Sequence, residues 1–371
     1  MRLADYACLN SLLLARAHFL KCPPKKAVVV HETGPANSPQ ALSYEEMETP
    51  NIQPNHALVR NVYAGLNFID TYHRSGLYAR SVPFILGQEG AGTIVALGDS
   101  QETVDAEFGI GQRVVYSTFG SYAEYTLVPL SQLVSIPPSM DYTTAIAAYV
   151  QGLTAHYLTT SAHANLISKG DSMLIYSVGS GTGQWAAQMA KLQGFHVIGT
   201  CSSGKQRQAE QCHCDALIVL PEVEGKGLGY ADYEGSVDVV QKVMEVTNNK
   251  GVKCVLDGVG KSTYKISLKA LAPRGIFVSF GNASGTVPPF PLTTLTSKSA
   301  FCTRPKLKDY IASREELQSR MKEVFGWIQE GKVKVCTDCE FDLENVQEAH
   351  EYMEAGNSRG KILFQVSKDL S

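Results

Sequence analysis

The sequence predicts an α/β fold that combines a doubly wound parallel sheet with a separate β-rich domain. Residues from about 152 to 293 alternate short apolar strands with helical segments, which is the pattern of a parallel sheet. Residues 25–151 instead alternate short apolar runs with Gly and Pro turns, which is typical of a β-rich domain. The chain of 371 residues exceeds the usual size of one core and allows both.

The first 24 residues differ in composition from those that follow. They contain three basic residues, Arg2, Arg16 and Lys21, but a single acid before Pro23. The segment is too short and too interrupted to span a membrane, and it lacks the small-residue cleavage site of a secretory signal. A mitochondrial presequence, an amphipathic surface helix and an upstream translation start all fit it. We expect the globular chain to begin near Lys25.

Strands of the β-rich domain are expected at 57–59, 92–97 and 113–116. Near the end of the chain, residues 314–331 predict a helix and residues 361–366 predict a strand. A closing strand so late in the chain suggests that the chain returns to complete the first domain. The predicted organisation is an extension at 1–24, a first domain at 25–151, a second domain at 152–293 and the return at 294–371.

A glycine-rich turn lies at the start of the second domain. It reads SVGSGTG at 177–183, between the apolar run 173–176 and a helical pattern at 184–193. Such a turn lets backbone N–H groups approach a pyrophosphate, and the helix N-terminus adds a partial positive charge. A tight turn with no ligand could look the same, but both flanks favour a bound dinucleotide. The residues expected to hold it are Ser180, Gly181, Thr182 and Gly183.

The end of the next strand, at 196–201, indicates whether the dinucleotide is NAD(H) or NADP(H). An NAD-selective fold usually places an acid at the end of this strand to bind the adenosine ribose, and no acid stands here. Polar and basic residues stand there instead, and they can donate hydrogen bonds and positive charge to a 2′-phosphate. NADPH is therefore favoured, although solvated charges at a helix start would look alike. The residues concerned are Ser202, Ser203, Lys205 and Arg207.

Composition narrows the class of protein. Hydrophobic residues make up 44% and charged residues 19%, and the net charge of −3 gives no basic field for nucleic acid or an anionic membrane. The nine cysteines have no disulfide-framework spacing, which favours a reducing compartment, and we expect a cytoplasmic protein. Two close cysteine pairs, 212/214 and 336/339, lack a second ligand pair at zinc-site spacing.

Several separate segments carry a family resemblance: GLNFIDTY at 65–72, RSGLY at 74–78, QGLTA at 151–155 and FGNASG at 280–285. From about residue 26 to 367 the chain resembles the zeta-crystallin-like quinone oxidoreductases of the medium-chain dehydrogenase/reductase superfamily. The resemblance implies a GroES-like catalytic domain, a Rossmann domain, an active site in the cleft between them and a homodimer. The chain departs from the family in its phosphate loop, where only Gly183 is retained, and at 218–221, where relatives often place a tyrosine.

Zinc-dependent members of the superfamily place Cys and His ligands where this chain has Asn67, Gln88 and Val150. An amide or an aliphatic side chain cannot replace a thiolate or an imidazole on zinc. Without a Lewis acid, the acceptor must delocalise the incoming electrons itself. We therefore predict zinc-independent transfer of reducing equivalents from NADPH to a quinone, with the number of electrons open. The alternatives are an alkenal or enone reductase of the same fold and an NADPH-regulated RNA-binding protein.

Site residues follow from the resembling segments. Asn67 and Tyr72 are expected to hold the nicotinamide amide and the acceptor oxygen by hydrogen bonds, and Tyr78 to wall the acceptor pocket, unless it is a core aromatic. Thr154 is expected at the nicotinamide, or else as a helix-start hydroxyl. The segment at 280–285 follows a strand whose carboxyl end should face the ligand. Further residues expected at the cofactor are Phe280, Gly281, Asn282, Ser284 and, by resemblance, Lys361.

Overall fold

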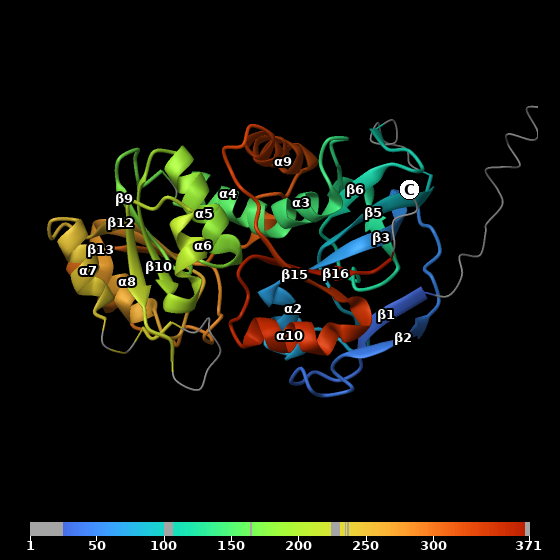
Figure 1. The fold of residues 1–371 in the computed structure, drawn as a ribbon, viewed down its shortest axis with the longest axis horizontal. Helices are drawn as coiled ribbons and strands as arrows, with labels where there is room; N and C mark the ends of the chain where they lie inside the picture. Colours follow the sequence, from blue (N-terminus) through green and yellow to red (C-terminus); the bar gives the residue numbers. More distant parts are fainter. Residues whose placement is uncertain are drawn as a thin grey trace, which may run out of the picture.

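The computed structural model describes residues 25–99, 107–163, 165–223, 231–233, 235 and 237–367. The predictions made for residues 1–24 lie outside these residues. Figure 1 shows two parts side by side along the long axis, one around a parallel sheet and one around a mostly antiparallel sheet. The predicted α/β class, with a nucleotide-type sheet and a β-rich part, is confirmed.

The nucleotide sheet has six parallel strands in the order β11-β10-β9-β12-β13-β14. The strand order reverses between β9 and β12, and ligands of open α/β sheets collect at the carboxyl ends of strands beside such a switch point. The strands are β9 (Ser172–Ile175), β10 (His196–Ser202), β11 (Ala216–Leu220), β12 (Val252–Asp257), β13 (Leu271–Ser279) and β14 (Phe301–Thr303). The helices around them are α5 (Gly181–Leu192), α6 (Gln206–Glu210), α7 (Val239–Val246) and α8 (Tyr264–Ala270).

The second large sheet belongs to the part that the resemblance identifies as the catalytic domain, and we call it the catalytic sheet. It has seven strands in the order β15-β16-β3-β5-β6-β8, with β7 paired to β3. Its strands β15 and β16 come from the end of the chain, and Ile362 pairs with Leu66 in an antiparallel ladder. A smaller sheet, β2-β1-β4, lies beside it. The strands are β1 (Lys25–Val30), β2 (Ser43–Met47), β3 (His56–Leu66), β4 (Phe84–Ile85), β5 (Gly90–Leu97), β6 (Arg113–Tyr116), β7 (Tyr125–Pro129), β8 (Leu133–Ser135), β15 (Thr337–Asp342) and β16 (Lys361–Gln365).

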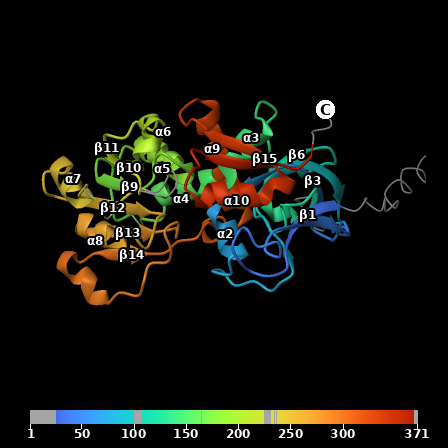
Figure 2. The same cartoon turned by 60° about the horizontal axis from the view of Figure 1, so that its bottom comes forward.

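A nearly continuous helical path joins the two parts (Figure 2). It runs through α3 (Tyr142–Ala147), a π-helical turn (Ala148–Gly152) and α4 (Leu153–Thr160), and α9 (Arg314–Gln329) packs against it. The largest hydrophobic cluster contains Val115 of the catalytic sheet and Met173 of the nucleotide sheet, so the core is shared between the two parts. Two further helices, α2 (Phe68–Arg74) and α10 (Val346–Glu354), lie on the catalytic side.

Candidate active site

Two tyrosines of the catalytic part meet a loop of the nucleotide part. The backbone N–H of Asn282, just after β13, donates to the Tyr72 hydroxyl at 3.0 Å, and its side-chain amide donates to the Tyr78 hydroxyl at 3.4 Å. The two rings pack edge to face with centroids 5.3 Å apart. Helix α2 positions Tyr72, whose carbonyl accepts the Tyr78 N–H at 3.0 Å. Three residues predicted from separate segments therefore lie together between the two parts.

Arg304 adds a positive charge to this group. It follows β14, and its guanidinium donates to Ser279 Oγ and to the Gly281 carbonyl, each at 2.9 Å. Its second terminal nitrogen donates to the Tyr78 hydroxyl at 3.4 Å. Because both Asn282 and Arg304 donate to the oxygen of Tyr78, that hydroxyl can give its own proton to the oxygen of a ligand.

Asn67 is held from two sides in the interior of the catalytic part. Its Nδ2 donates to Glu89 Oε2 at 2.9 Å, and its Oδ1 accepts from Lys361 Nζ at 2.9 Å. Lys361 and Glu89 form an ion pair in which both side chains are 0% exposed. A Cβ on Gly65 would lie 2.2 Å from Glu89 Oε2, so glycine is needed beside the pair. The pair fixes the orientation of the Asn67 amide.

Two buried carboxyl groups also hold the backbone here. Glu89 Oε1 accepts the Val150 N–H at 2.6 Å, in the π-helical turn before α4. Asp70 Oδ2 accepts the Asn67 N–H at 2.8 Å and the Tyr122 hydroxyl at 3.0 Å. Burial raises the pKa of Asp70 to about 7, against the lowering by those two donors. A π-helical turn is common at functional sites, and here an acid holds it in place.

The glycine-rich turn has the features that a pyrophosphate requires. A Cβ on Gly183 would lie 2.2 Å from the Ser177 carbonyl oxygen, so only glycine lets α5 begin so close to β9. Ser180 is the N-cap of α5 and makes no side-chain cap bond, which leaves the first N–H groups of the helix for a ligand. Among the described residues, the buried Oε1 of Gln151 has no partner, and its Nε2 faces Gly181. These residues fit a dinucleotide.

Lys205 lies at the same turn. It is 4% exposed, and its ammonium donates to Ser180 Oγ at 3.0 Å. Burial lowers the pKa of Lys205 to about 8, while the carboxylate of Asp338 acts in the opposite direction. The guanidinium of Arg359 also acts on it, and Gln184 of α5 donates to the Arg359 carbonyl at 2.6 Å. The return segment before β16 thus brings a second cation to the predicted phosphate cradle.

The remaining predicted cofactor residues take varied positions. The hydroxyl of Ser284 donates to the Val259 carbonyl at 2.8 Å and accepts the Ser262 N–H at 3.1 Å, so it holds two loops together. The others lie at or follow the carboxyl ends of β9, β10 and β13, except Thr154, which is on α4, and their contacts with a nucleotide stay predictions. They are the buried Ser202, the half-buried Thr154, Thr182, Phe280 and Gly281, and the exposed Ser203 and Arg207.

Three residues that contact the predicted site residues or their neighbours were not predicted from the sequence. Glu89 directly follows Gln88, one of the residues that stand where zinc-dependent relatives have a metal ligand. An acid so close to an apolar run is expected to be buried, and that signal could have found it. Arg304 stands directly after a short strand, where side chains reach the ligand edge of a parallel sheet. Glu222 stands two residues beyond the end of β11 and accepts the Gly204 N–H at 2.8 Å.

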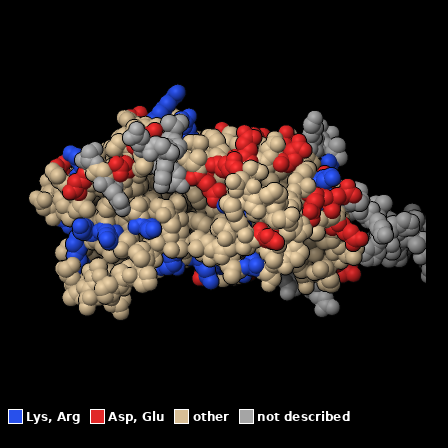
Figure 3. All heavy atoms as spheres, turned by 90° about the horizontal axis from the view of Figure 1, so that it is seen from below, with Lys and Arg blue, Asp and Glu red and all other residues tan. Residues whose placement is uncertain are grey.

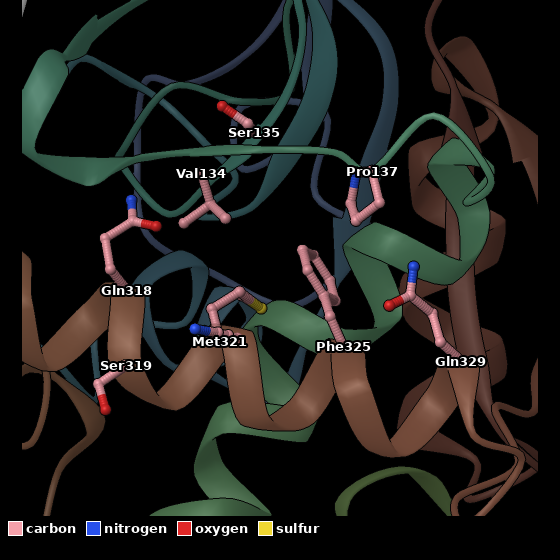
Figure 4. A pocket seen from close by; sticks show the side chains of 9 residues that line it. Val134, Ser135, Pro137, Gln318, Ser319, Met321, Phe325 and Gln329 are labelled. Atoms are coloured by element: carbon pink, nitrogen blue, oxygen red, sulfur yellow. The ribbon is translucent and has the colours of Figure 1, made fainter. Parts of the chain in front are cut away.

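A surface hollow of about 390 Å³ lies elsewhere, between α9 and β8 (Figure 4). Its lining includes Val134, Gln318 and Phe325, and none of the predicted site residues. On the face shown in Figure 3, acidic side chains gather mostly over the catalytic end at the right, and basic ones over the middle and the nucleotide end. Within the part of the chain that the structure describes, no helix is long and apolar enough to cross a bilayer.

Comparison with known proteins places this arrangement in a family. Residues 53–138 match the family described as "Alcohol dehydrogenase GroES-like domain", and residues 229–363 match "Zinc-binding dehydrogenase". The described residues hold no group of three or more His, Cys, Asp or Glu side chains placed to bind a metal ion. The two matches confirm the predicted pairing of a GroES-like domain with a dehydrogenase nucleotide domain.

Individual relatives cover almost the whole chain. A probable quinone oxidoreductase of Schizosaccharomyces pombe is 35% identical over 345 residues, which is 93% of this chain and 98% of that one. The 2-haloacrylate reductase of a Burkholderia species is 30% identical over 349 residues, covering 91% and 98%. The solved Escherichia coli quinone oxidoreductase complexed with NADPH has a TM-score of 0.81 and 32% identity, covering 92% and 99%. The chain belongs to the quinone oxidoreductase branch of the medium-chain dehydrogenase/reductase superfamily.

Proposed function

We propose that this protein is an NADPH-dependent quinone reductase. The observation that carries the proposal is the meeting of Tyr72 and Tyr78 from one part with Asn282 and Arg304 from the other. This group lies at the carboxyl edge of the sheet that also bears the glycine-rich turn and Lys205. The relatives named quinone oxidoreductase, one of them solved with NADPH, support both the acceptor class and the cofactor.

We assign separate cofactor-binding and catalytic roles to residues of this chain. The turn at 180–183 and the start of α5 hold the pyrophosphate, while Lys205, with Ser202, Ser203 and Arg207, binds the 2′-phosphate. Bound NADPH supplies a hydride from C4 of its nicotinamide ring. Tyr78 donates a hydrogen bond to the acceptor oxygen, and the Arg304 guanidinium stabilises the negative charge that develops there. Asn67, oriented by Lys361 and Glu89, positions the nicotinamide amide.

A second candidate is the reduction of α,β-unsaturated carbonyl compounds. The guanidinium of Arg304 beside Tyr78 suits an acceptor that carries a carboxylate, because such pairs form strong charge-assisted hydrogen bonds. The similarity to a 2-haloacrylate reductase, named for a small unsaturated acid, supports the same substrate class. The shape of the acceptor separates the two candidates, since a planar bicyclic quinone needs a wide aromatic slot and a linear enone does not.

The proposal includes the assembly, domain bounds and location of the protein. Strand β14 is the edge of the nucleotide sheet, and Phe301 on it is 45% exposed, which suits pairing with β14 of a second copy in a homodimer. We assign residues 25–151 and 294–371 to the catalytic domain and 152–293 to the nucleotide domain, with β14 added to its sheet. A cytoplasmic location is supported by the cysteine pattern.

The test is NADPH oxidation by the purified protein, followed by absorbance with an ortho-naphthoquinone and with a linear enone, each with and without a chelator. We expect chelator-resistant turnover of the quinone. Tyr78→Phe should lower kcat/KM for the quinone about 10- to 100-fold, and the control Tyr264→Phe, on α8 where the ring stacks on Phe290, should not change it. Turnover of the enone alone would favour the second candidate, and NADPH binding without turnover of either acceptor would contradict a reductase.

A further inference from the structure

A carboxylate lies at the turn where the sequence predicts the 2′-phosphate of NADPH to bind. Glu222 Oε1 accepts the Gly204 N–H at 2.8 Å and lies 3.5 Å from Ser203 Oγ. Its charge also acts on the ammonium of Lys205. All three of these partners belong to the short turn after β10 (Ser203–Lys205) that should receive the phosphate.

The position of Glu222 follows from the sheet. Strands β10 and β11 run parallel, and Ser202 at the end of β10 pairs with Leu220 at the end of β11. Both strands therefore end at the same edge, and Glu222 reaches sideways from the second strand to the turn after the first. An NAD-selective fold takes its ribose-binding acid from the end of the first of these strands. Here the neighbouring strand provides an acid at nearly the same place.

We propose that Glu222 is a specificity-determining residue that lowers the preference of this protein for NADPH and lets it bind NADH. With NADPH, the carboxylate lies against a dianionic phosphate and must give up the Gly204 N–H. With NADH, the same carboxylate accepts a hydrogen bond from the ribose 2′-hydroxyl. The inference rests on the proposed function, because it presumes that the turn after β10 binds the adenosine ribose of NADPH.

The test is calorimetric binding of NADPH, NADH, adenosine 2′,5′-bisphosphate and 5′-AMP to Glu222→Gln and to the wild type. The last two probes differ only by the 2′-phosphate, so the difference between their affinities reports on the binding of that phosphate. Gln keeps the shape and an oxygen for the Gly204 N–H while removing the charge. The matched control is Glu245→Gln on the exposed face of α7, where the same charge change occurs beside Lys242.

We expect Glu222→Gln to bind NADPH and adenosine 2′,5′-bisphosphate about tenfold more tightly, because one charge near a dianion in water contributes about that much. NADH and 5′-AMP should bind a few-fold more weakly, because the ribose 2′-hydroxyl loses a charged acceptor, and Glu245→Gln should match the wild type. Unchanged or weaker NADPH binding in Glu222→Gln, with a wild type that binds NADPH, would overturn this inference alone. A wild type that binds neither dinucleotide would overturn the proposed function and this inference with it.

Discussion

Lys361 and Lys205 were both predicted at the cofactor, and both are almost completely buried, yet their surroundings differ. The ammonium of Lys361 pairs with the buried carboxylate of Glu89 and also donates to Asn67. The hydrogen-bond acceptor of Lys205 is the neutral hydroxyl of Ser180, and burial lowers the pKa of this lysine to about 8. One lysine already has its anion within the protein, whereas the other is a desolvated cation at the mouth of a phosphate cradle.

Because their surroundings differ, we assign the two lysines different roles. A buried ion pair that also orients an amide is part of the framework of the site, so we regard Lys361 as a positioning residue for Asn67. A desolvated cation gains most when an anionic ligand arrives, so Lys205 is the residue we expect to bind phosphate. The predictions below are ordered by the size of the expected effect and test this division.

The largest effect is expected from Lys361→Met, which leaves Glu89 buried without its cation. Removing one partner of a buried ion pair costs about 3–5 kcal/mol of unfolding free energy. Urea denaturation should show this loss. Lys191→Met is the matched control, because Lys191 pairs with Asp215 at a site where both side chains are about one-third exposed, and it should cost under about 1 kcal/mol. A loss in Lys361→Met no larger than in the control would contradict the framework role.

Lys205→Met should act on binding rather than on stability. The change removes one charge-assisted hydrogen bond to phosphate, worth about 1.5–3 kcal/mol, so NADPH should bind roughly 10- to 150-fold more weakly by calorimetry. Unfolding free energy should not fall, because the lowered pKa shows that the fold disfavours the charge. A variant that unfolds more easily but binds NADPH normally would reverse the assignment.

NADPH affinity should also depend on pH through Lys205. Because the pKa of Lys205 in the free protein is about 8, half of the ammonium groups have lost their proton at about pH 8, whereas bound phosphate favours the protonated form. The affinity should therefore be full below about pH 7 and fall by up to about tenfold per pH unit well above about pH 8. Fluorescence titration from pH 7 to 9.5 measures this fall. Lys205→Arg, whose guanidinium keeps its proton, should flatten the profile, and an equally steep fall in that variant would point to another group.

The smallest effects on stability are expected from removing the hydroxyls of Tyr72 and Tyr78. Tyr72→Phe removes the hydroxyl that accepts the Asn282 N–H between the two parts. The loss of one hydrogen bond should lower the unfolding free energy by about 0.5–1.5 kcal/mol. Tyr78→Phe should change stability less, since its contacts with Asn282 and Arg304 are long, at 3.4 Å. Equal denaturation midpoints for the wild type and Tyr72→Phe would show that the stability of the protein does not depend on this contact.

The sequence was sufficient to predict features that depend on residues close together in the chain. The glycine-rich turn and its flanks predicted the start of α5, whereas the 2′-phosphate site inferred from the lack of an acid after residue 201 stays a prediction. Family segments also named Tyr72, Tyr78 and Asn282, which the structure brings together. Such features depend on neighbours along the chain, or on motifs that carry their own spacing.

Long-range pairing could not be predicted in this way. Glu89 and Lys361 are 272 positions apart, and the ladders of β16 on β3 and of β3 on β5 bring them together. For the same reason, the sequence could not show that Lys361 points inward while Arg359 lies beside Lys205. Glu222 became visible only once β10 and β11 were known to end at one edge.

The most direct test of the division between the two lysines is thermal denaturation of the wild type, Lys205→Met and Lys361→Met, each with increasing NADPH. A ligand that binds only the folded state raises Tm by an amount that grows with the logarithm of its concentration divided by its Kd. We expect Lys361→Met to start at a lower Tm and still rise with NADPH, and Lys205→Met to start no lower than the wild type and rise much less. A Lys205→Met protein whose Tm rises as far as that of the wild type at each NADPH concentration would contradict the account.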